Sequence, residues 1–336
     1  MEIRYATYRS GQSTAMNFRG LDLNLLVALD ALLAEKSTTR AGEKICLSQP
    51  AVSGALARLR HFFGDELLVQ VGHKMVLTPL AEELAGPVRH ALLNVESVVN
   101  RDSTFDPATS TRRFRIMLSD YAATVLMSCL LPALQREAPG IRIEMISNSE
   151  SPLPAIEQGE VDLLVIPRQF SSVSLPSEEL FTDHYVCIAW TGNRSCVKKL
   201  TMDDYLRLGH VAARFGRAQQ VSADEQFMTE MGIVRRIEVV VMSFNMIPQM
   251  VLNTDRIATM HSRLAHLFAN TLPLRIIEPP LEIPNIVEVM NWHKIRDQDR
   301  GLSWLRQKLK EAAAETAVKT PRTLVRQDRN GARKAR

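Results

Sequence analysis

Apolar residues recur at the spacing of a helix in three successive segments near the start of the chain. Residues 21–35 carry leucines along one face, residues 38–45 make a short second segment, and residues 48–63 carry a third apolar stripe. Only a tight turn separates the second segment from the third. Ala41 and Gly42 are small enough for two helices to cross closely there, so the pattern predicts a helix-turn-helix motif.

The third segment has the features of a helix that enters a DNA groove. Ser48 is suited to cap its first turn, and Pro50 lies where a missing N–H costs no hydrogen bond. Its polar face carries no acidic residue, and the side chains of Gln49 and Ser53 can pair with base edges. The alternative is an ordinary amphipathic helix whose polar face is solvated. The flanking elements favour the DNA-binding interpretation.

Two short β-rich runs follow on either side of Gly72, His73 and Lys74. They predict a hairpin with a basic tip, which is the wing of a winged helix-turn-helix domain. This domain should span residues 17–78. Residues 1–16 are polar and unpatterned, which predicts a disordered extension, with Met16 as an alternative start of translation.

A long linker helix is expected over residues 79–100. Its apolar residues follow a four-and-three spacing, which is typical of a coiled-coil seam that joins two chains. Gly86 and Pro87 interrupt the pattern and predict a bend. The alternative is that the same face packs on the helix's own domain. The residues of this seam are Leu80, Leu84, Val88, Ala91, Val95 and Val98.

Strands and helices alternate after a run of turn-forming residues that predicts a hinge over residues 101–112. The order βαβαβ predicts a parallel sheet. We expect an α/β domain over residues 113–313 with two lobes, similar to periplasmic binding proteins that close on a ligand. The expected parts are lobe I at 113–166 and 267–313, with strands at 274–277 and 286–290, lobe II at 167–266, and a disordered basic tail at 314–336.

Composition indicates an ordinary soluble protein, with 46% hydrophobic and 23% charged residues among 336. No apolar run could span a bilayer and the N-terminus lacks a signal-peptide core, so we expect a cytoplasmic protein with no membrane contact. The cysteines, at positions 46, 129, 187 and 196, form no CxxC motif, and we expect no metal and no cofactor. A redox switch between Cys187 and Cys196 is an alternative to buried free thiols, which are the commoner state.

The net charge of +4 is unevenly distributed. Residues 17–100 hold eight Lys or Arg against nine Asp or Glu, so a DNA-binding function cannot rest on bulk basicity there. It rests on placement, because the acids fall outside the face of the third helix. The expected DNA-binding residues are Thr38, Arg40, Ser48, Gln49, Pro50, Ser53, Gly54, Arg58, His73 and Lys74.

Polar groups at the ends of predicted strands indicate a ligand site, because ligands of open α/β sheets lie beyond the carboxyl ends of the strands. The helix N-terminus at Ser119 and Asp120 offers N–H groups to an anion or a phenolic oxygen, with Asp120 as a plain helix cap the alternative. Met246 offers a further apolar contact, whereas His210 and His261 are expected to be structural. The expected effector-binding residues are Ser119, Asp120, Asn148, Arg168, Asp183, Ser243, Phe244 and Asn245.

Short motifs in this order and spacing resemble those of LysR-type transcriptional regulators, and the resemblance continues to about residue 310. Residues 105–107, 255–259, 292–293 and 304–306 look like the branch that holds rhizobial nodulation-gene activators and activators of naphthalene, salicylate and chloroaromatic catabolism. Arg60 stands where most of the wider family has Glu. The motifs are Leu23-Asn24-Leu25-Leu26, Ala41-Gly42-Glu43-Lys44, Leu47-Ser48-Gln49-Pro50-Ala51-Val52-Ser53, Leu59-Arg60, Glu66-Leu67-Leu68 and Leu77-Thr78-Pro79.

The resemblance implies a homo-oligomer, with linker helices pairing two chains and effector domains pairing dimers into a tetramer. It implies double-stranded promoter DNA, a small aromatic effector and RNA polymerase as partners. Salicylate-responsive relatives carry a His where we align Asp183, which argues against a simple salicylate-type ligand. Enzyme signatures such as G-x-S-x-G, a P-loop or G-x-G-x-x-G are absent from the sequence, so we expect no catalysis.

The sequence therefore predicts a fold of three parts, a winged helix-turn-helix domain, a linker helix and a two-lobed α/β effector domain. The expected function is activation of an operon for the catabolism of aromatic or chloroaromatic compounds. The alternatives are a nodulation-type regulator that responds to flavonoids, or a regulator with a redox or non-aromatic signal.

Overall fold

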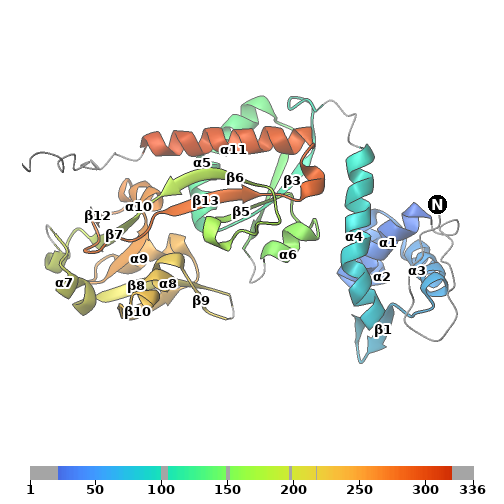
Figure 1. Cartoon of the computed structure of the whole chain (residues 1–336), viewed down its shortest axis with the longest axis horizontal. Coiled ribbons are helices and arrows are strands. Elements are labelled where there is room, and N and C mark those ends of the chain that lie inside the picture. The colour runs from blue at the N-terminus through green and yellow to red at the C-terminus, as the bar shows by residue number, and fades with distance from the viewer. Residues whose placement is uncertain (1–21, 100–104, 149–151, 197–198, 217, 320–336) are drawn as a thin grey trace, which may run out of the picture. The chain divides into compact units, whose positions relative to one another are not determined.

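The computed structural model describes residues 22–99, 105–148, 152–196, 199–216 and 218–319 (Figure 1). The chain forms two compact units, residues 1–101 and residues 102–336. The extension expected at 1–16, the first part of the hinge and most of the basic tail lie outside the described residues.

The first unit is a three-helix core with a two-stranded hairpin and a long helix. Each of the first three helices begins with an N-cap whose side-chain oxygen accepts a hydrogen bond from a backbone N–H of the first turn; the N-caps are Asp22, Ser37 and Ser48. The elements are α1 (Leu23–Glu35), α2 (Thr38–Ile45), α3 (Gln49–Phe63), β1 (Leu68–Val71), β2 (Lys74–Leu77) and α4 (Pro79–Val99).

The turn between α2 and α3 requires the small residues that the sequence offers there. A Cβ atom on Gly42 would lie 2.6 Å from the carbonyl oxygen of Leu47, which no side chain could tolerate without a shift of the backbone. Cys46 adopts the left-handed conformation, with φ of 56°, and reverses the chain in two residues. Val52 and Leu59 are then fully buried against α1.

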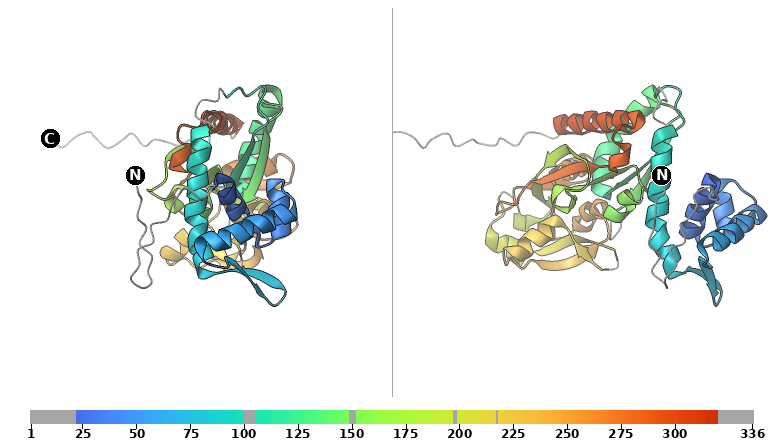
Figure 2. Two further views of the ribbon diagram at one scale, coloured as in Figure 1. Left: turned by 90° about the vertical axis from the view of Figure 1, so that its right-hand side faces the viewer. Right: turned by 45° about the vertical axis from the view of Figure 1, so that its right-hand side comes forward.

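The hairpin is antiparallel, with Val71 opposite Lys74 and Gly72 at a φ of 63° in its turn. Arg60 holds the start of the hairpin against α3, because its guanidinium donates to the carbonyl oxygens of Glu66 and Leu68, each at 2.8 Å. In the views of Figure 2 the hairpin projects beyond the base of α4. Arg60 thus has a structural role.

Helix α4 is continuous through Pro87, where the sequence predicts a bend. Its apolar face is divided between two environments. Leu84 and Val88 pack on the core of their own domain, whereas Val95 and Val98 are 37% and 70% exposed. The N-terminal half of the predicted seam is therefore used within the chain, and only its C-terminal half is free for a partner.

Lobe I of the second unit is a five-stranded sheet in the order β4-β3-β5-β13-β6. Strands β3, β4 and β5 are parallel, and β13 is antiparallel to β5 and β6. Helices α5 and α11 pack on each other beside this sheet (Figure 1). Its elements are β3 (Arg113–Leu118), α5 (Asp120–Glu137), β4 (Arg142–Ser147), α6 (Pro152–Glu157), β5 (Leu163–Pro167), β6 (Ser177–Asp183), β13 (Ile286–Asn291) and α11 (Arg300–Lys319).

Lobe II is a second sheet, in the order β10-β8-β11-β7-β12 with β9 paired to β8. Its buried centre is formed by β7, β8 and β11, whose side chains are almost all enclosed. Its elements are β7 (Tyr185–Trp190), α7 (Met202–Arg207), β8 (Gly209–Phe215), β9 (Gln220–Val221), α8 (Ala223–Glu230), β10 (Arg236–Val241), α9 (Ile247–Val251), β11 (Ile257–His261), α10 (Ser262–Ala269) and β12 (Leu274–Ile277).

The predicted lobe boundaries are wrong at two strands. Strand β6 pairs with β13 and belongs to lobe I, and β12 pairs with β7 and belongs to lobe II. The chain therefore enters lobe II at Asp183–His184, not at Pro167, and leaves it after Ile277. The apolar run at residues 274–277 predicts a strand, and the sequence predicts none over β6, but in both cases strand partners that are distant in sequence leave no local signal.

The ends of the second unit also differ from expectation. The ring of Phe105, inside the predicted hinge, lies 5.5 Å from the ring of Trp304 on α11. Arg112 forms two 2.7 Å hydrogen bonds with the carboxylate of Asp299. Helix α11 continues to Lys319, beyond the expected end at residue 313, and the Arg263 side chain donates to its Ala313 carbonyl at 2.9 Å. No helix in the described ranges is both long and apolar enough to cross a membrane.

The Arg112–Asp299 pair should stabilise the second unit. Burial acts to raise the pKa of Asp299, but the Arg112 hydrogen bonds and charge outweigh it and hold the pKa below 3.8. The resulting stability is present above this ordinary pKa and is lost as the pH falls through the folded-state value. Arg112→Ala should lower the free energy of unfolding at pH 7 by about 2 kcal/mol, because Asp299 is left half-buried without its partner.

All three tryptophans lie in the second unit, so denaturant titrations followed by tryptophan fluorescence report on it. Asp299→Asn can keep the oxygen that caps Leu302 of α11, but it removes the charge and replaces the other oxygen, an acceptor for Arg112, with an amide nitrogen. The control Arg168→Ala breaks a pair whose side chains are 59% and 51% exposed and should change little. Additive effects of Arg112→Ala and Asp299→Asn would show that the pair contributes nothing.

Candidate functional site

The exposed face of α3 carries the predicted base-contacting groups. Ser48, Gln49 and Pro50 are exposed at its first turn, and the Gln49 amide nitrogen lies 3.0 Å from the Ser53 hydroxyl oxygen. This bond holds the Gln49 side chain along the helix surface, where amide and hydroxyl form one polar patch. A Cβ atom on Gly54 would meet no neighbour within 4 Å, so its backbone is open to a flat partner.

The other predicted DNA-binding residues differ in how exposed their side chains are and in whether they already have partners. Arg58 is exposed on α3, and His73 and Lys74 are exposed at the hairpin tip, where neither side chain pairs with another described residue. Arg40 instead turns back on α1, donating to the Glu35 carbonyl and pairing with its carboxylate at 3.6 Å. Thr38 is half-buried at the start of α2. The hairpin tip thus offers free basic groups, whereas Arg40 is engaged in the fold.

A cavity of about 440 Å³ lies between the lobes of the second unit. Ligand sites of small molecules typically measure roughly 300–1,000 Å³. The described residues around it include no Lys or Arg. It is lined by Ser119, Asp120, Tyr121, Ser147, Asn148, Pro152, Leu153, Ile166, Pro167, Phe170, Phe215, Gly216, Gln220, Val221, Ser222, Ala223, Met242, Ser243, Phe244, His261, Ile286 and Glu288.

At one edge of the cavity, hydrogen bonds join the two lobes; we call this group of residues, Asp120, Thr124, Ser243 and Asn245, the latch. Ser119 caps α5 by accepting from the Ala122 N–H at 3.1 Å. The Asp120 carboxylate, instead of capping its own helix, accepts from the Ser243 hydroxyl at 2.6 Å and from the Asn245 N–H at 2.9 Å. Asp120 therefore already has donors from lobe II, and its expected role shifts from ligand contact to lobe closure.

Asn245 completes this latch without lining the cavity. Its side-chain nitrogen lies 2.9 Å from the Thr124 hydroxyl on α5. Phe244, in the same short 3₁₀ turn (Phe244–Met246), lines the cavity and packs edge-on against His261 with ring centroids 4.7 Å apart. A ligand between the lobes would therefore contact the same turn that holds them together.

The floor of the cavity, which we define as Tyr121, His261 and Glu288, is a buried group of titratable side chains. The rings of Tyr121 and His261 stack with centroids 3.8 Å apart. The Tyr121 hydroxyl donates to Asp183 at 2.7 Å. Burial lowers the pKa of His261, and burial together with the charge of Asp183 raises that of Tyr121, so both side chains are neutral near pH 7.

Glu288 on β13 is only 2% exposed and has no hydrogen-bond partner among the described residues. Burial, and then the charge of Asp183, raise its pKa from 4.5 to about 8. The side chain is therefore mainly the neutral acid at pH 7, with a hydroxyl that has no acceptor. A buried polar group without a partner is costly, which makes it a candidate ligand contact.

Three expected effector-binding residues do not line the cavity. Arg168 is exposed and pairs with Glu179 at 2.7 Å. Asp183 lies behind the floor, where it accepts from Tyr121, from the His184 N–H and from the Arg263 N–H. Asn245 acts in the latch, and Met246 also lies outside the lining. Ser119, Asp120, Asn148, Ser243 and Phe244 do line it, and the Asn148 side-chain oxygen is buried without a partner.

The three floor residues were not among those expected to bind an effector, although His261 is the last residue of β11. Tyr121 and His261 look like core aromatics in the sequence. Glu288 offers the only clear signal, because an acid in the apolar run of residues 286–290 is unusual for a strand buried on both faces. The strand-end rule finds the rim of the cavity and misses its floor.

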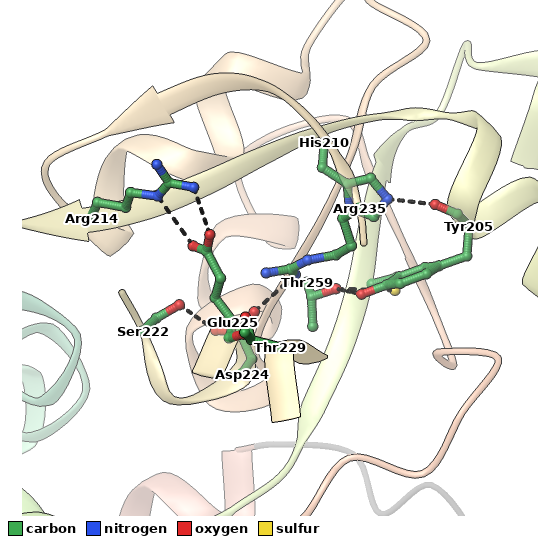
Figure 3. Close-up of polar contacts among 10 residues, drawn as sticks. Tyr205, His210, Arg214, Ser222, Asp224, Glu225, Thr229, Arg235 and Thr259 are labelled. Atoms are coloured by element: carbon green, nitrogen blue, oxygen red, sulfur yellow. Dashed lines mark hydrogen bonds and ion pairs between the residues drawn. The ribbon is translucent and has the colours of Figure 1, made fainter. Parts of the chain in front are cut away.

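A second polar network supports the lobe II wall of the cavity, at Ser222 and Ala223 (Figure 3). Asp224 accepts from the Ser222 hydroxyl and pairs with the buried Arg235 at 3.0 Å. Arg214 on β8 pairs with Glu225 on α8 at 2.7 Å. These ion pairs fasten α8 to the strands beside it and so fix the wall.

On the other side of Arg235, His210 and Tyr205 complete the network. The His210 ring nitrogen lies 2.6 Å from the Tyr205 carbonyl oxygen, and the Tyr205 hydroxyl lies 2.7 Å from that of Thr259. Burial lowers the pKa of His210 to about 4 and raises that of Tyr205 to about 12. His210 is structural, as expected.

A metal site and a redox switch both depend on how the His, Cys, Asp and Glu side chains of the described part of the chain are grouped. No three His, Cys, Asp or Glu side chains gather there in a group that could hold a metal ion. Cys187 is fully buried on β7 beside the Thr259 hydroxyl. The side chain of Cys196 lies outside the described ones, so the redox alternative stays a hypothesis.

Both units match known families. Residues 23–82 match the bacterial regulatory helix-turn-helix proteins of the lysR family, and residues 107–314 match the LysR substrate binding domain. Nodulation protein D of Bradyrhizobium sp. (strain ANU 289) is 46% identical over 303 residues, which cover 90% of this chain and 89% of that protein. Nodulation protein D 1 of Bradyrhizobium diazoefficiens is 45% identical over 303 residues, 90% of this chain and 96% of that protein.

Solved structures agree with this assignment. A probable transcriptional regulator from Pseudomonas aeruginosa, 26% identical, covers 87% of this chain and 97% of its own, with a TM-score of 0.65. A full-length OxyR variant from the same species shares the fold at 15% identity, with a TM-score of 0.69 over 90% of this chain and 99% of its own. The chain belongs to the LysR family of DNA-binding transcriptional regulators.

Proposed function

We propose that this regulator is of the nodulation type and that an uncharged flavonoid-like phenol, bound between the lobes of its second unit, controls its activity. The observation that carries the proposal is the inter-lobe cavity of about 440 Å³, which has aromatic walls and no described cation. The names of its relatives supply the biological setting, because the nodulation D proteins are 45–46% identical over almost the whole chain.

Activation of an aromatic-catabolic operon has no support among these relatives. The chemistry of the cavity argues in the same direction. Benzoate and salicylate carry a carboxylate, which needs a cation or several donors when it is taken out of water. The described lining offers Asp120 and Glu288 as its carboxyl groups and no Lys or Arg. An uncharged ring system with a few oxygens suits it better.

The effector contacts we propose are Ser119, Asn148, Ser243 and Phe244, with Asp120 and Asn245 holding the latch. Phe170 and Phe215 add apolar contacts for an aromatic ring. A ligand shifts the balance between two states of the regulator only through different affinities for them. Contact with both Ser119 and Phe244 would provide such a difference, because these residues belong to opposite lobes.

For DNA, we propose that Gln49 and Ser53 contact bases and that Ser48, Arg58, His73 and Lys74 contact phosphates or the minor groove. Pro50 and Gly54 would give close apolar approach. Two helix-turn-helix units are usually needed for a specific site. The exposed Val95 and Val98 of α4 offer a surface for pairing two chains, and the tetramer and the contact with RNA polymerase extend this proposal.

The first prediction concerns base recognition. Gln49→Ala should weaken binding by about 1–3 kcal/mol at a cognate site selected from random DNA, because a bidentate pair with one base is lost. Binding to unselected DNA should barely change. Gel-shift titrations on both DNAs make the comparison, and an equal loss on the two would remove Gln49 from base recognition.

The second prediction concerns the hairpin tip. Lys74→Ala should weaken binding to every sequence and reduce the slope of log affinity against log salt by roughly one unit, because one phosphate contact is lost. The matched control is Lys294→Ala, which removes an exposed charge from the second unit. The proposed role of Lys74 fails if both variants keep the wild-type slope.

The third prediction concerns the ligand. Flavone, naringenin, benzoate and salicylate can be compared by their effect on the thermal transition of the second unit. An effector at about 100 times its dissociation constant should add about 2.7 kcal/mol of stability. Phe170→Ala should weaken the response to flavonoids, whereas Val173→Ala, on an exposed side chain outside the cavity, should not. Stabilisation by the carboxylates alone would contradict the proposal.

A further inference from the structure

The floor of the cavity contains polar atoms that the fold itself leaves unused. The Glu288 Oε2 atom and the His261 Nδ1 atom are both enclosed and have no hydrogen-bond partner among the described residues. The two side chains are 2% exposed and both line the cavity. They come from different lobes, Glu288 from β13 and His261 from β11. Unused buried polar atoms on both sides of one cavity indicate a missing partner.

We propose that Glu288 donates a hydrogen bond to a carbonyl oxygen of the bound effector, with His261 as the second polar contact, so that the floor selects uncharged aromatic ketones. This inference rests on the proposed function, because it names the group of the flavonoid-like ligand that the floor binds. The ligand class is an aromatic ring system conjugated to a ketone. Phenols without a ketone should bind more weakly.

The charges around Glu288 explain why it would act as a donor. Asp183 at the end of β6 and Asp120 on α5 are the carboxylates on this side of the cavity, and the hydroxyls of Tyr121 and Tyr185 remain protonated because burial raises their pKa values. The guanidinium of Arg263, which lies beside Phe181 in the described structure, donates to the Ala313 and Thr316 oxygens of α11. Burial beside an acidic neighbour favours the neutral acid.

The remaining groups near the floor do not compete for this role. His261 is enclosed and neutral, and its ring is fixed by stacking on Tyr121. His184 lies 3.8 Å from the Asp183 carboxylate, is 42% exposed and is not among the described lining residues. A carboxylate ligand would face Asp183 and Asp120 without a partner at the floor. A ketone oxygen, which only accepts, complements the Glu288 hydroxyl.

The test measures dissociation constants of flavone and flavan for the full-length protein by isothermal titration calorimetry. The two compounds share their ring skeleton and neither has an ionisable group, whereas flavan lacks the ketone and the C2–C3 double bond of flavone. Wild type should bind flavone at least tenfold more tightly at pH 7. Glu288, with a pKa of about 8, ionises between pH 7 and pH 9. The affinity of the wild-type protein for flavone should therefore fall by about tenfold over this range, whereas its affinity for flavan should not change.

Two substitutions at Glu288 separate donation from packing. Glu288→Leu keeps the bulk and removes the donor, so flavone and flavan should bind with similar affinities at both pH values. Glu288→Gln restores a donor that cannot ionise, so the preference for flavone should return without its dependence on pH. The control Glu282→Gln removes an exposed carboxylate from outside the cavity and should behave as wild type.

The outcomes distinguish this inference from the proposed function. If flavone binds to wild type and to Glu288→Leu equally well, with no dependence on pH, the role of Glu288 is overturned and the flavonoid-type effector stands. If Glu288→Gln keeps the pH dependence of wild type, another group titrates and the assignment is wrong. If wild type binds neither compound, this inference fails, and the proposed function fails with it if naringenin does not stabilise the second unit either.

Discussion

The two-lobed unit depends most on the hydrogen bonds that the Asp183 carboxylate accepts. Asp183 lies where the chain passes from β6 of lobe I to β7 of lobe II, and it is almost fully buried. It accepts from the Tyr121 hydroxyl on α5 and from the Arg263 N–H at the start of α10. Donors from both lobes thus meet at one group, and without it each would be left unpaired in the interior. The hydrogen bond from Tyr121 also fixes the position of this residue in the floor of the cavity.

The same carboxylate gives Glu288 its unusual chemistry, because its charge adds to the effect of burial. Two acids of lobe II, in contrast to Glu288, have ion-pair partners. Asp224 and Glu225 are each paired with an arginine, Arg235 and Arg214, and these pairs hold α8 against its sheet. One wall of the cavity is therefore rigid because its acids are satisfied, while the floor keeps one acid without a partner.

The sequence predicts local features well and distant pairings poorly. The helix-turn-helix follows from residues within one short stretch, and the close approach at Gly42 is visible in the residue type itself. The lobe assignment of β6 and β12 depends on partners about 100 residues away, and alternation of apolar residues carries no information on them. The rim of the cavity, at Ser119, Asn148 and Ser243, follows from the strand-end rule. Its floor does not, because Tyr121 in α5, His261 at the end of β11 and Glu288 within β13 are buried residues that resemble ordinary core in the sequence.

The position of β13 has a consequence for the order of folding. It lies between β5 and β6 in the lobe I sheet, although all of lobe II separates it from them in the sequence. The contact order of the second unit is therefore high, while the contacts of the first unit, up to the packing of α4 on α1, span shorter stretches of sequence. During synthesis, which runs from the N-terminus, the DNA-binding unit can fold early. The facing edges of β5 and β6 stay open until residues 286–291 emerge, so a chain cut short before them would expose two unpaired strand edges and be prone to aggregate.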